Sequence, residues 1–564
     1  MVSAFLQLPL LAAWRREFAD YSWPIFRRDL LAGLTVGAVG LPLALAFGVA
    51  SGADAAAGLV TAILAGVIIA GLGGASYQIS GPTGAMSAVL IVLAQRYGLG
   101  GIWVAGLMAG LFLLLLGLFR LGRYIAFIPS PVITGFTSGI ALIIAIGQID
   151  NFLGIQTPKA ENNLTKLLGY FIHPIAPDWH AVTLALIVML VMLLLPRLTR
   201  AVPGSLLGIA IATAVAMAAG WQVPQIGAIP RTILLDQRLT WSAIPWSSLA
   251  DLLPAAISIA ALGGIESLLC GAVGATMTGR PLDSNQELIG QGIGNLLIPF
   301  FGGVPATAAI ARTSVGVKSG GMTRVMSFVH SGVLLLSVLA LAPLIGRIPL
   351  SALAGVLMMT AWRMNEWESI HFFSRTRLKH AITGALVTMV ATVALDLTQA
   401  ILIGIAISAL IYIRQSAGSV GVTDESVDLE RLRQIGHRVL TSDASTHIYY
   451  LTGPLFFGSV HPVLEAFESA RDYRAIVISM RGVPLIDAMG SQALSQIVEE
   501  QHRRGGQVCF SGLQPAVREM FARTGLLKTV GEENIFWSAD QAIVAIHADQ
   551  AAHRKADTEV SRIS

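Results

Sequence analysis

The sequence predicts an all-α membrane protein followed by a small soluble α/β domain, and three observations lead to this fold class. Apolar residues make up 54% of the 564 residues and charged residues only 12%, which is too few charges to cover the surface of a soluble protein. Apolar runs long enough to cross about 30 Å of hydrocarbon recur from Leu30 onward. After Arg414 the composition becomes that of a globular domain, in which strand-like and helix-like segments alternate.

The first segment, residues 1–29, is expected to lie in the cytoplasm. The stretch Ala4–Ala13 is apolar, but no basic residue precedes it, and Arg15 and Arg16 follow it. This order favours a segment at the membrane interface over a cleaved signal peptide.

Fourteen membrane segments are predicted in the transmembrane domain, residues 30–415. Twelve are long runs that begin near Leu30, Ala55, Gly101, Ile128, Ala181, Pro203, Leu252, Gln286, Val325, Ile348, Ala381 and Leu397. The other two, Pro82–Leu93 and Pro305–Val317, have about a dozen residues each, so as helices they reach only about 18–20 Å. Both lie beside Gly and Pro residues, which is typical of a half-helix that starts inside the membrane.

Positive charges near the ends of the segments predict the orientation. With the N-terminus inside, sixteen Lys and Arg residues fall on the cytoplasmic side and six outside, as the positive-inside rule requires. The six outside are Arg96, Lys159, Lys166, Arg231, Arg238 and Arg347. Both termini are therefore expected in the cytoplasm, and the membrane is expected to be the inner (plasma) membrane.

Three features recur at nearly the same offset along the chain. Pro82 and Pro305 are 223 residues apart, the first and eighth segments begin about 221 apart, and the Ile-Pro pair at 128–129 recurs at 348–349. This offset predicts two repeats of seven segments, and because seven is odd the second repeat must be inverted. The alternative is that Gly-Pro pairs only kink ordinary spans, which does not account for a shared offset.

Inverted repeats with broken helices are an architecture of secondary transporters. In that architecture the N-termini of the two half-helices face each other near the middle of the membrane. Each N-terminus presents unpaired backbone N–H groups and the positive end of a helix dipole. Such an end binds anions before any side chain is added, so the sequence predicts a small anion as substrate.

Two charged residues lie in otherwise apolar segments. Glu266 is the single ionisable residue of the span Leu252–Ala275, and Arg312 lies about two turns beyond Pro305. A charge at bilayer depth costs at least about 2.5–3.5 kcal/mol on insertion scales, so each needs a reason to be there. We interpret Arg312 as electrostatic support for the anion and Glu266 as the group that binds a co-transported proton. The alternative is a fixed Glu266–Arg312 pair that only stabilises the fold.

Other kinds of chemistry find no support in the sequence. No Gly-x-x-x-x-Gly-Lys-[Ser/Thr] loop occurs, so ATP-driven transport is not indicated. Two cysteines, Cys270 and Cys509, and eleven scattered histidines form no disulfide framework or metal-ligand spacing. The net charge of +4 is too small for a nucleic-acid partner. No cofactor, no metal and no enzyme activity are expected.

The C-terminal part is predicted to comprise a linker at 416–436, an α/β domain at 437–550 and a tail at 551–564. The predicted strands are His447–Leu451, Leu455–Phe457, Ala475–Met480 and Gln507–Ser511. The predicted helices are Val460–Ala470, Ser491–Arg503 and Pro515–Thr524. Asp487 and Ser491 lie at a strand-to-helix turn, where they could cap the helix or serve in signalling.

These motifs resemble those of the SulP anion transporters, the family that includes pendrin and prestin. The resemblance rests on Ser80-Gly-Pro-Thr-Gly-Ala, on Pro305-Ala-Thr-Ala-Ala-Ile-Ala-Arg-Thr and on Glu266, and the soluble domain resembles their STAS domain through Asp487-x-x-Gly490. The resemblance covers about residues 24–550. The family likeness implies core and gate domains, an elevator-like motion and a homodimer, and it leaves the partner of the STAS domain open.

The resemblance also implies site residues. The implied anion pocket comprises Leu43, Phe47, Thr83, Gly84, Ala85, Ala311 and Arg312, and Glu266 matches the acidic position of proton-coupled members. Three residues depart from related proteins. Ile310 replaces a hydroxyl ligand of sodium-coupled bicarbonate members, Leu43 replaces the Gln of many sulfate carriers, and Ala488 replaces a phosphorylated Ser of bacterial regulators.

The expected function is proton-coupled symport of a small, sulfate-like oxyanion. Sodium-coupled bicarbonate transport or dicarboxylate transport are the alternatives within the same class. The alternative from another class is a membrane-embedded sensor or scaffold that transports nothing.

Overall fold

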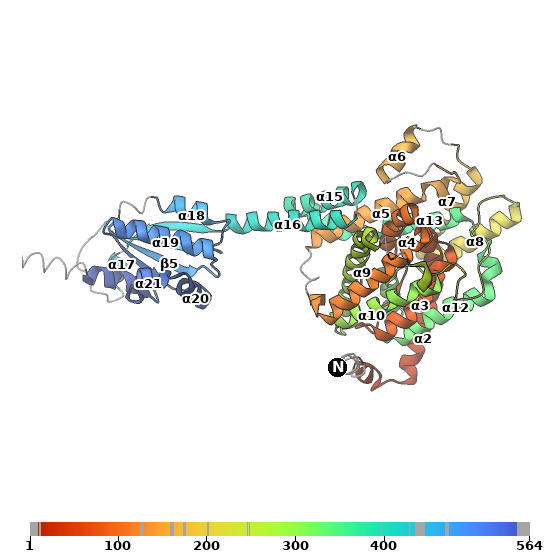
Figure 1. The fold of residues 1–564 in the computed structure, drawn as a ribbon, viewed down its shortest axis with the longest axis horizontal. Helices are drawn as coiled ribbons and strands as arrows, with labels where there is room; N and C mark the ends of the chain where they lie inside the picture. The colour runs from red at the N-terminus through yellow and green to blue at the C-terminus, as the bar shows by residue number, and fades with distance from the viewer. Residues whose placement is uncertain are drawn as a thin grey trace, which may run out of the picture. The chain divides into compact units, whose positions relative to one another are not determined.

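The computed structural model describes residues 10, 13–123, 129–157, 163–172, 176–199, 202–244, 246, 249–395, 397–427, 429–434, 446–468 and 473–549. Most of the predicted interfacial stretch at 4–13 and the whole tail at 551–564 lie outside the described residues. The chain divides into two compact units, Met1–Ala406 and Ile407–Ser564, and each is described by itself (Figure 1).

The first half of unit 1 is a succession of apolar helices interrupted by one short strand. The elements are α2 (Trp23–Ala50), α3 (Ala55–Leu72), β1 (Ser80–Gly81), α4 (Gly84–Leu118), α5 (Ser130–Leu153), α6 (Asn163–Ile172), α7 (Trp179–Leu198) and α8 (Gly204–Ala219). The long α4 contains two helical segments joined at Gly98, whose φ of 68° is a conformation that favours glycine. The predicted third and fourth segments are therefore the two parts of α4.

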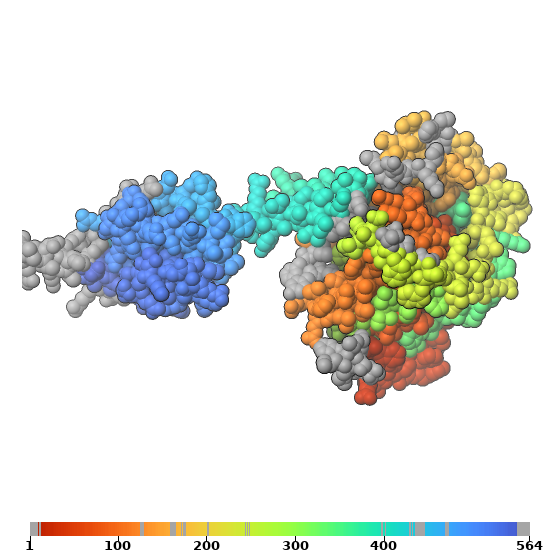
Figure 2. All heavy atoms as spheres, viewed as in Figure 1, coloured from red at the N-terminus to blue at the C-terminus, as the bar shows by residue number. Residues whose placement is uncertain are grey.

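The second half repeats this order of elements. They are α9 (Leu249–Thr278), α10 (Ser284–Leu297), β2 (Thr307–Ala308), α11 (Ile310–Lys318), α12 (Val325–Ile345), α13 (Leu350–Met364), α14 (Trp367–Arg375), α15 (Lys379–Ala394) and α16 (Leu397–Gly418), which continues into unit 2. The short strand again precedes a short helix. Figure 2 shows red and orange atoms of the first half in contact with green atoms of the second.

Seven of the described helices are long and apolar enough to cross a membrane: α2, α3, α4, α5, α7, α9 and α12. Counting α4 as two segments and adding α8, α10, α11, α13, α15 and α16 gives the fourteen predicted segments. The predicted fold class, fourteen helices in two inverted repeats followed by an α/β domain, is confirmed.

Exposed leucines mark the surface that faces lipid. On α7, Leu186, Leu190 and Leu193 are each more than half exposed, and they lie on one face of the helix because they are three or four residues apart. A soluble protein rarely exposes so continuous an apolar face, so this face is suited to the bilayer.

The helices of unit 1 form two packed groups. One contains α2, α3, α4, α9, α10, α11 and α12, and the other contains α5, α7, α8, α13 and α15. These groups match the core and gate domains that the resemblance implied. They touch mainly where α2 meets α13 and where α4 meets α5.

The segment before α2 is anchored to the core group. Glu17 forms a buried ion pair with Arg324 (2.8 Å), and the Trp14 indole donates to the Gly71 carbonyl (3.1 Å). Asp29 is fully buried and accepts from the backbone N–H of Thr323 (3.1 Å) and from its hydroxyl (2.6 Å). A buried carboxylate is stable there because it is fully hydrogen-bonded.

Unit 2 contains a five-stranded sheet in the order β3-β4-β5-β6-β7. The strands are β3 (Gly421–Ser426), β4 (Thr446–Thr452), β5 (Ala475–Gly482), β6 (Gln507–Ser511) and β7 (Ile535–Phe536). The β3–β4 pair is antiparallel and the other pairs are parallel.

Helices cover both faces of this sheet. They are α17 (Leu429–Gln434), α18 (Val460–Ala466), α19 (Ala488–Arg503), α20 (Pro515–Thr524), α21 (Leu526–Val530) and a helix at 539–549. Ile476 and Ile478 of β5 face α18 to α21, whereas Ala475 and Val477 face α17 and the last helix. This alternation is the period of two that a strand buried on both faces must show.

Part of the predicted linker at 416–436 belongs to the sheet. Within it the structure has strand β3, which pairs along its whole length with β4. The sequence concealed this edge strand because its residues from Thr423 onward are polar and exposed. The predicted strand at Leu455–Phe457 is wrong, since only Leu455 pairs, in a single bridge to Ile486.

The turn before α19 has a structural role. Asp487 is the N-cap of α19, accepting from the N–H of Gly490 (2.7 Å), and its other carboxylate oxygen accepts from the N–H of Phe457 (3.0 Å). Ser491 is buried, and its hydroxyl bonds to that of Thr524 (2.7 Å). Asp487 therefore holds the turn in place, and Ser491 joins α19 to α20.

Neither cysteine of the native protein is expected to react with iodoacetamide at pH 8. Burial raises the pKa of the Cys509 thiol to about 12, so only about one molecule in ten thousand is the reactive thiolate at that pH. Cys270 is only 1% exposed. Intact-mass measurement should show no label in detergent and two labels in denaturant. Met489→Cys, at a position that is 53% exposed, is the positive control, and rapid native labelling of either natural cysteine would contradict this packing.

Candidate anion site between the half-helices

Two short strands lie within unit 1 next to the starts of two helices. β1 and β2 are antiparallel, with Ser80 opposite Ala308 and Gly81 opposite Thr307. Equivalent strands of inverted repeats run in opposite directions when they meet, so this ladder joins the two repeats. α4 begins three residues after β1 and α11 two residues after β2. Both helix N-termini therefore lie close to the ladder.

The second short helix begins later than predicted. It starts at Ile310 and not at Pro305. The segment just before α11 is held extended by Asn295 of α10. The Asn295 side chain accepts from the N–H of Ala306 (2.7 Å) and donates to the Ala306 carbonyl (2.9 Å). Arg312 consequently lies in the first turn of α11, whereas the sequence predicted two turns of helix before it.

The first backbone N–H groups of α4 precede its intrahelical hydrogen bonds. Thr83 is the N-cap, and its hydroxyl oxygen accepts from the N–H of Met86 (3.3 Å). The first intrahelical bond runs from the N–H of Ser87 to the carbonyl of Thr83 (2.9 Å). The N–H groups of Gly84 and Ala85 precede that bond and have no intrahelical acceptor. Two amides and the positive end of the helix dipole therefore coincide there.

The two charged residues contact adjacent positions just before α4. The Glu266 carboxylate accepts from the Thr83 hydroxyl (3.0 Å), and Arg312 Nη2 donates to the Pro82 carbonyl (2.8 Å). Pro82, predicted to start the first half-helix, thus precedes it. In the part of the chain that the structure describes, no ion pair joins Glu266 to Arg312, so a direct pair between them does not explain why two charged residues lie in apolar segments.

The guanidinium of Arg312 is enclosed by protein. The residue is 1% exposed, and its Nε and Nη1 atoms have no hydrogen-bond partner among the described residues. A Cβ atom on Gly81 would lie 2.7 Å from Nη1, so the absence of a side chain at Gly81 leaves room for the cation. The positive charge of Arg312 therefore lies next to residues 81 and 82, which lie just before α4.

Side chains from both helix groups cover Gly84. A Cβ atom there would lie 2.5 Å from Ile144 Cδ1, 3.1 Å from Phe47 Cε1 and 3.2 Å from Met364 Sδ. Ile144 and Met364 belong to α5 and α13, whereas Phe47 belongs to α2. The start of α4 is therefore where the core and gate groups meet.

The predicted pocket residues differ in burial. Leu43 and Phe47 are 9% and 5% exposed on α2, and Thr83, Gly84 and Ala85 are buried at the start of α4. Ala311 is exposed in the first turn of α11. The structure therefore brings Phe47 and Gly84 together and places Ala311 on an open side of α11.

Sequence reasoning missed a polar row on α10 that supports the strands. Glu287, Gln291 and Asn295 are buried and four residues apart, and Gln291 donates to both Glu287 (3.0 Å) and the Ser80 hydroxyl (3.0 Å). Three polar residues at this spacing in a predicted span were the available signal. No group of three or more His, Cys, Asp or Glu side chains able to hold a metal occurs among the described residues.

Gly84→Ala is expected to lower the midpoint of thermal unfolding in detergent and to slow transport several-fold. The added methyl collides with Ile144 Cδ1, and overpacking of this kind costs about 1–3 kcal/mol. Ile144→Val removes that Cδ1 atom, so the double variant should recover part of both losses. Failure of Ile144→Val to restore either property would contradict the close approach of α5 to α4.

Comparison with known proteins gives two family matches. The sulfate permease family matches residues 26–392, and the STAS domain matches residues 438–542. The putative sulfate transporter YvdB of Bacillus subtilis is 35% identical over 546 residues, which is 93% of this chain and 98% of that protein. The bicarbonate transporter BicA of Picosynechococcus is 30% identical over 92% of this chain and 94% of its own length.

A solved structure shares the fold over nearly the whole chain. The murine Slc26a9 anion transporter, in its inward-facing state, superposes with a TM-score of 0.82 at 18% identity, covering 97% of this chain and 95% of its own. At that identity the similarity concerns the fold alone.

Proposed function

Since this chain belongs to the sulfate permease family, we propose that it carries a small inorganic anion across a membrane by secondary active transport and catalyses no reaction. The observation that carries the proposal is the start of α4, where the amides of Gly84 and Ala85, which have no intrahelical acceptor, lie near the buried guanidinium of Arg312. An anion that has shed its water needs such donors in exchange.

The substrate we favour is a sulfate-like oxyanion. Proteins named as sulfate and bicarbonate transporters are similar to this chain over nine-tenths of its length. Bicarbonate is therefore the main rival, and a dicarboxylate is a further one. Leu43 and Phe47 would line the site with apolar side chains. The backbone amides at the start of α4 would then be the main hydrogen-bond donors to the anion.

Glu266 is the proposed proton-coupling residue. Its carboxylate bonds to the hydroxyl of Thr83, the residue that caps α4. When charged, Glu266 repels an anion at this N-terminus, and protonation removes the repulsion, so proton and anion favour each other's binding. Sodium is the alternative coupling ion, although Ile310 offers no oxygen ligand.

The proposed motion is an elevator-like movement of the core group against the gate group in a homodimer. The packing of α2 to α4 with α9 to α12 supports a rigid core, since the hydrogen bonds that join β1 to α10 and to β2 lie within it. In the proposed orientation both termini are cytoplasmic and the membrane is the inner membrane, as the distribution of Lys and Arg indicates.

Uptake into liposomes containing the purified protein tests this function. Labelled sulfate is supplied with an inward proton gradient, and bicarbonate, chloride and fumarate are added as competitors. We expect saturable uptake that one of these anions competes for, and none in liposomes without protein. A folded protein that binds and moves none of the four anions would contradict transport and favour the sensor or scaffold.

A further inference from the structure

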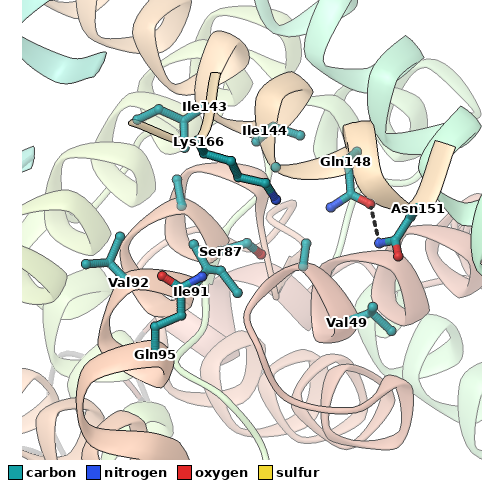
Figure 3. A pocket seen from close by; sticks show the side chains of 13 residues that line it. Val49, Ser87, Ile91, Val92, Gln95, Ile143, Ile144, Gln148, Asn151 and Lys166 are labelled. Carbon is teal, nitrogen blue, oxygen red and sulfur yellow. Dashed lines mark hydrogen bonds between the residues drawn. The ribbon is translucent and has the colours of Figure 1, made fainter. Parts of the chain in front are cut away.

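A cavity lies between α4 and α5, beyond the candidate site (Figure 3). It has a volume of about 140 Å³, several times the roughly 10–15 Å³ that one water molecule needs. Its walls are the end of α2, the first part of α4, the second half of α5 and Lys166 of α6. We call it the α4–α5 cavity.

The charge in the α4–α5 cavity is positive. Lys166 is the one charged residue among the thirteen described residues that line it, and the other polar ones include Gln95, Gln148 and Asn151. Figure 3 shows the Lys166 amine directed into the space between α4 and α5. Amide N–H groups and an ammonium are all hydrogen-bond donors, and no carboxylate lines the wall to oppose them.

The ion-pair partner of Lys166 lies outside the cavity wall. Asp150 accepts from Lys166 Nζ at 2.9 Å but does not line the cavity. Its oxygens also accept from the Tyr170 hydroxyl (2.6 Å) and the Thr157 hydroxyl (2.9 Å). The carboxylate is thus held from the far side, and the positive end of the pair faces the cavity. Asp150 positions the ammonium, which keeps further N–H donors for a ligand.

The inner end of the α4–α5 cavity lies close to the candidate anion site. Ser87, one turn after the amides of Gly84 and Ala85, lines the cavity, and so does Ile144. Ile144 Cδ1 also lies against Gly84. Ile144 therefore lies both on the cavity wall and against the start of α4, so its displacement would open a path between the two.

We infer that the α4–α5 cavity is a second anion-binding site, in which Lys166 holds the substrate before it passes Ile144 to the start of α4. The inference rests on the proposed function and deepens it. Lys166 is predicted on the outer side of the membrane, and so is Arg96, the residue after Gln95 of the cavity wall. The cavity therefore receives the anion from the outer side. Its ligand class is a small inorganic oxyanion.

A charge-sensitive labelling experiment tests the electrostatics without transport. Val92 lines the cavity and is 40% exposed, whereas Cys270 and Cys509 are 1% exposed. Val92→Cys therefore supplies an accessible thiol. We expect it to react faster with an anionic methanethiosulfonate than with a cationic one, and Lys166→Gln to lower that rate ratio about 10-fold. Arg347→Gln removes an equal charge elsewhere on the predicted outer side. Equal ratios with and without Lys166 would overturn the inference.

A transport experiment then tests the role of the site. Lys166→Gln should raise the KM for sulfate or bicarbonate uptake about 10-fold and weaken its salt dependence, while Vmax changes less than about twofold. Lys166→Arg should stay near wild type. If Lys166→Gln combined with Asp150→Asn restores the wild-type KM, the higher KM of Lys166→Gln comes from repulsion by the Asp150 carboxylate that has lost its ion pair. That result would overturn the inference. Absence of uptake by the wild-type protein would contradict the proposed function. The labelling ratio would still show whether Lys166 makes the α4–α5 cavity attract anions.

Discussion

Replacing Arg312 by Gln is expected to reduce anion uptake into proteoliposomes at least about 100-fold. The Arg312 guanidinium is enclosed behind the start of α4 and bonds to the Pro82 carbonyl. In a low-dielectric site its charge acts on an anion far more strongly than in water. Removing one member of a buried charged interaction typically costs about 2–5 kcal/mol, and about 2.7 kcal/mol corresponds to 100-fold.

Arg312→Lys separates the charge from the shape of the side chain. Lys keeps the positive charge and one donor for Pro82 but loses the planar guanidinium, so we expect a loss of about tenfold or less. Thermal unfolding and thiol labelling in detergent establish that each variant is folded. If folded Gln and Lys variants lose transport equally, the positive charge is not what supports the anion.

The broken helices could be predicted because their signals are local. Gly and Pro disfavour a continuous helix through their own backbone chemistry, and the offset between Pro82 and Pro305 is a count along the chain. The start of α11 could not be predicted, because the chain before it is held by Asn295 of another helix. The position of Pro305 in the sequence therefore predicted the break in the helix. The residue at which α11 begins depends on tertiary contacts that the sequence does not show.

The partners of the site residues were also beyond the sequence. Glu266 and Arg312 were identified from their charge in apolar segments, and a direct pair between them was the alternative interpretation. In the structure Glu266 bonds to Thr83 and Arg312 to Pro82, more than 180 residues away in each case. Charge identifies an unusual buried residue, whereas its partner depends on how the two repeats pack.

Glu287 shows that a usable signal was missed. It lies near the start of a predicted span, and its carboxylate accepts from the N–H groups of Gly74 (2.9 Å) and Ala75 (3.2 Å). These bonds satisfy the carboxylate within the core group, which is a structural role. Two acids, half-buried Glu266 and buried Glu287, therefore lie in the membrane domain, and they differ in what they contact.

Glu266→Gln is expected to abolish the dependence of anion accumulation on the proton gradient. Gln has the same length, and its amide oxygen can still accept from the Thr83 hydroxyl, but it cannot bind a proton. For symport of one proton with one anion, each unit of pH gradient supplies about 1.4 kcal/mol, enough for about tenfold accumulation. The wild-type protein should approach that ratio in sealed liposomes at zero membrane potential, and the variant should only equilibrate the anion.

Glu287→Gln is the matched comparison for this prediction. It neutralises another acid of the membrane domain, whose partners are backbone N–H groups and Gln291 rather than the cap of α4. If Glu266 carries the proton, Glu287→Gln lowers the unfolding temperature but leaves the accumulation ratio of the folded fraction unchanged. Unaltered accumulation in Glu266→Gln, or its loss only in Glu287→Gln, would remove Glu266 from the coupling step. The hydrogen bond to Thr83 favours Glu266, because it is the acid in direct contact with the residue that caps the proposed anion site.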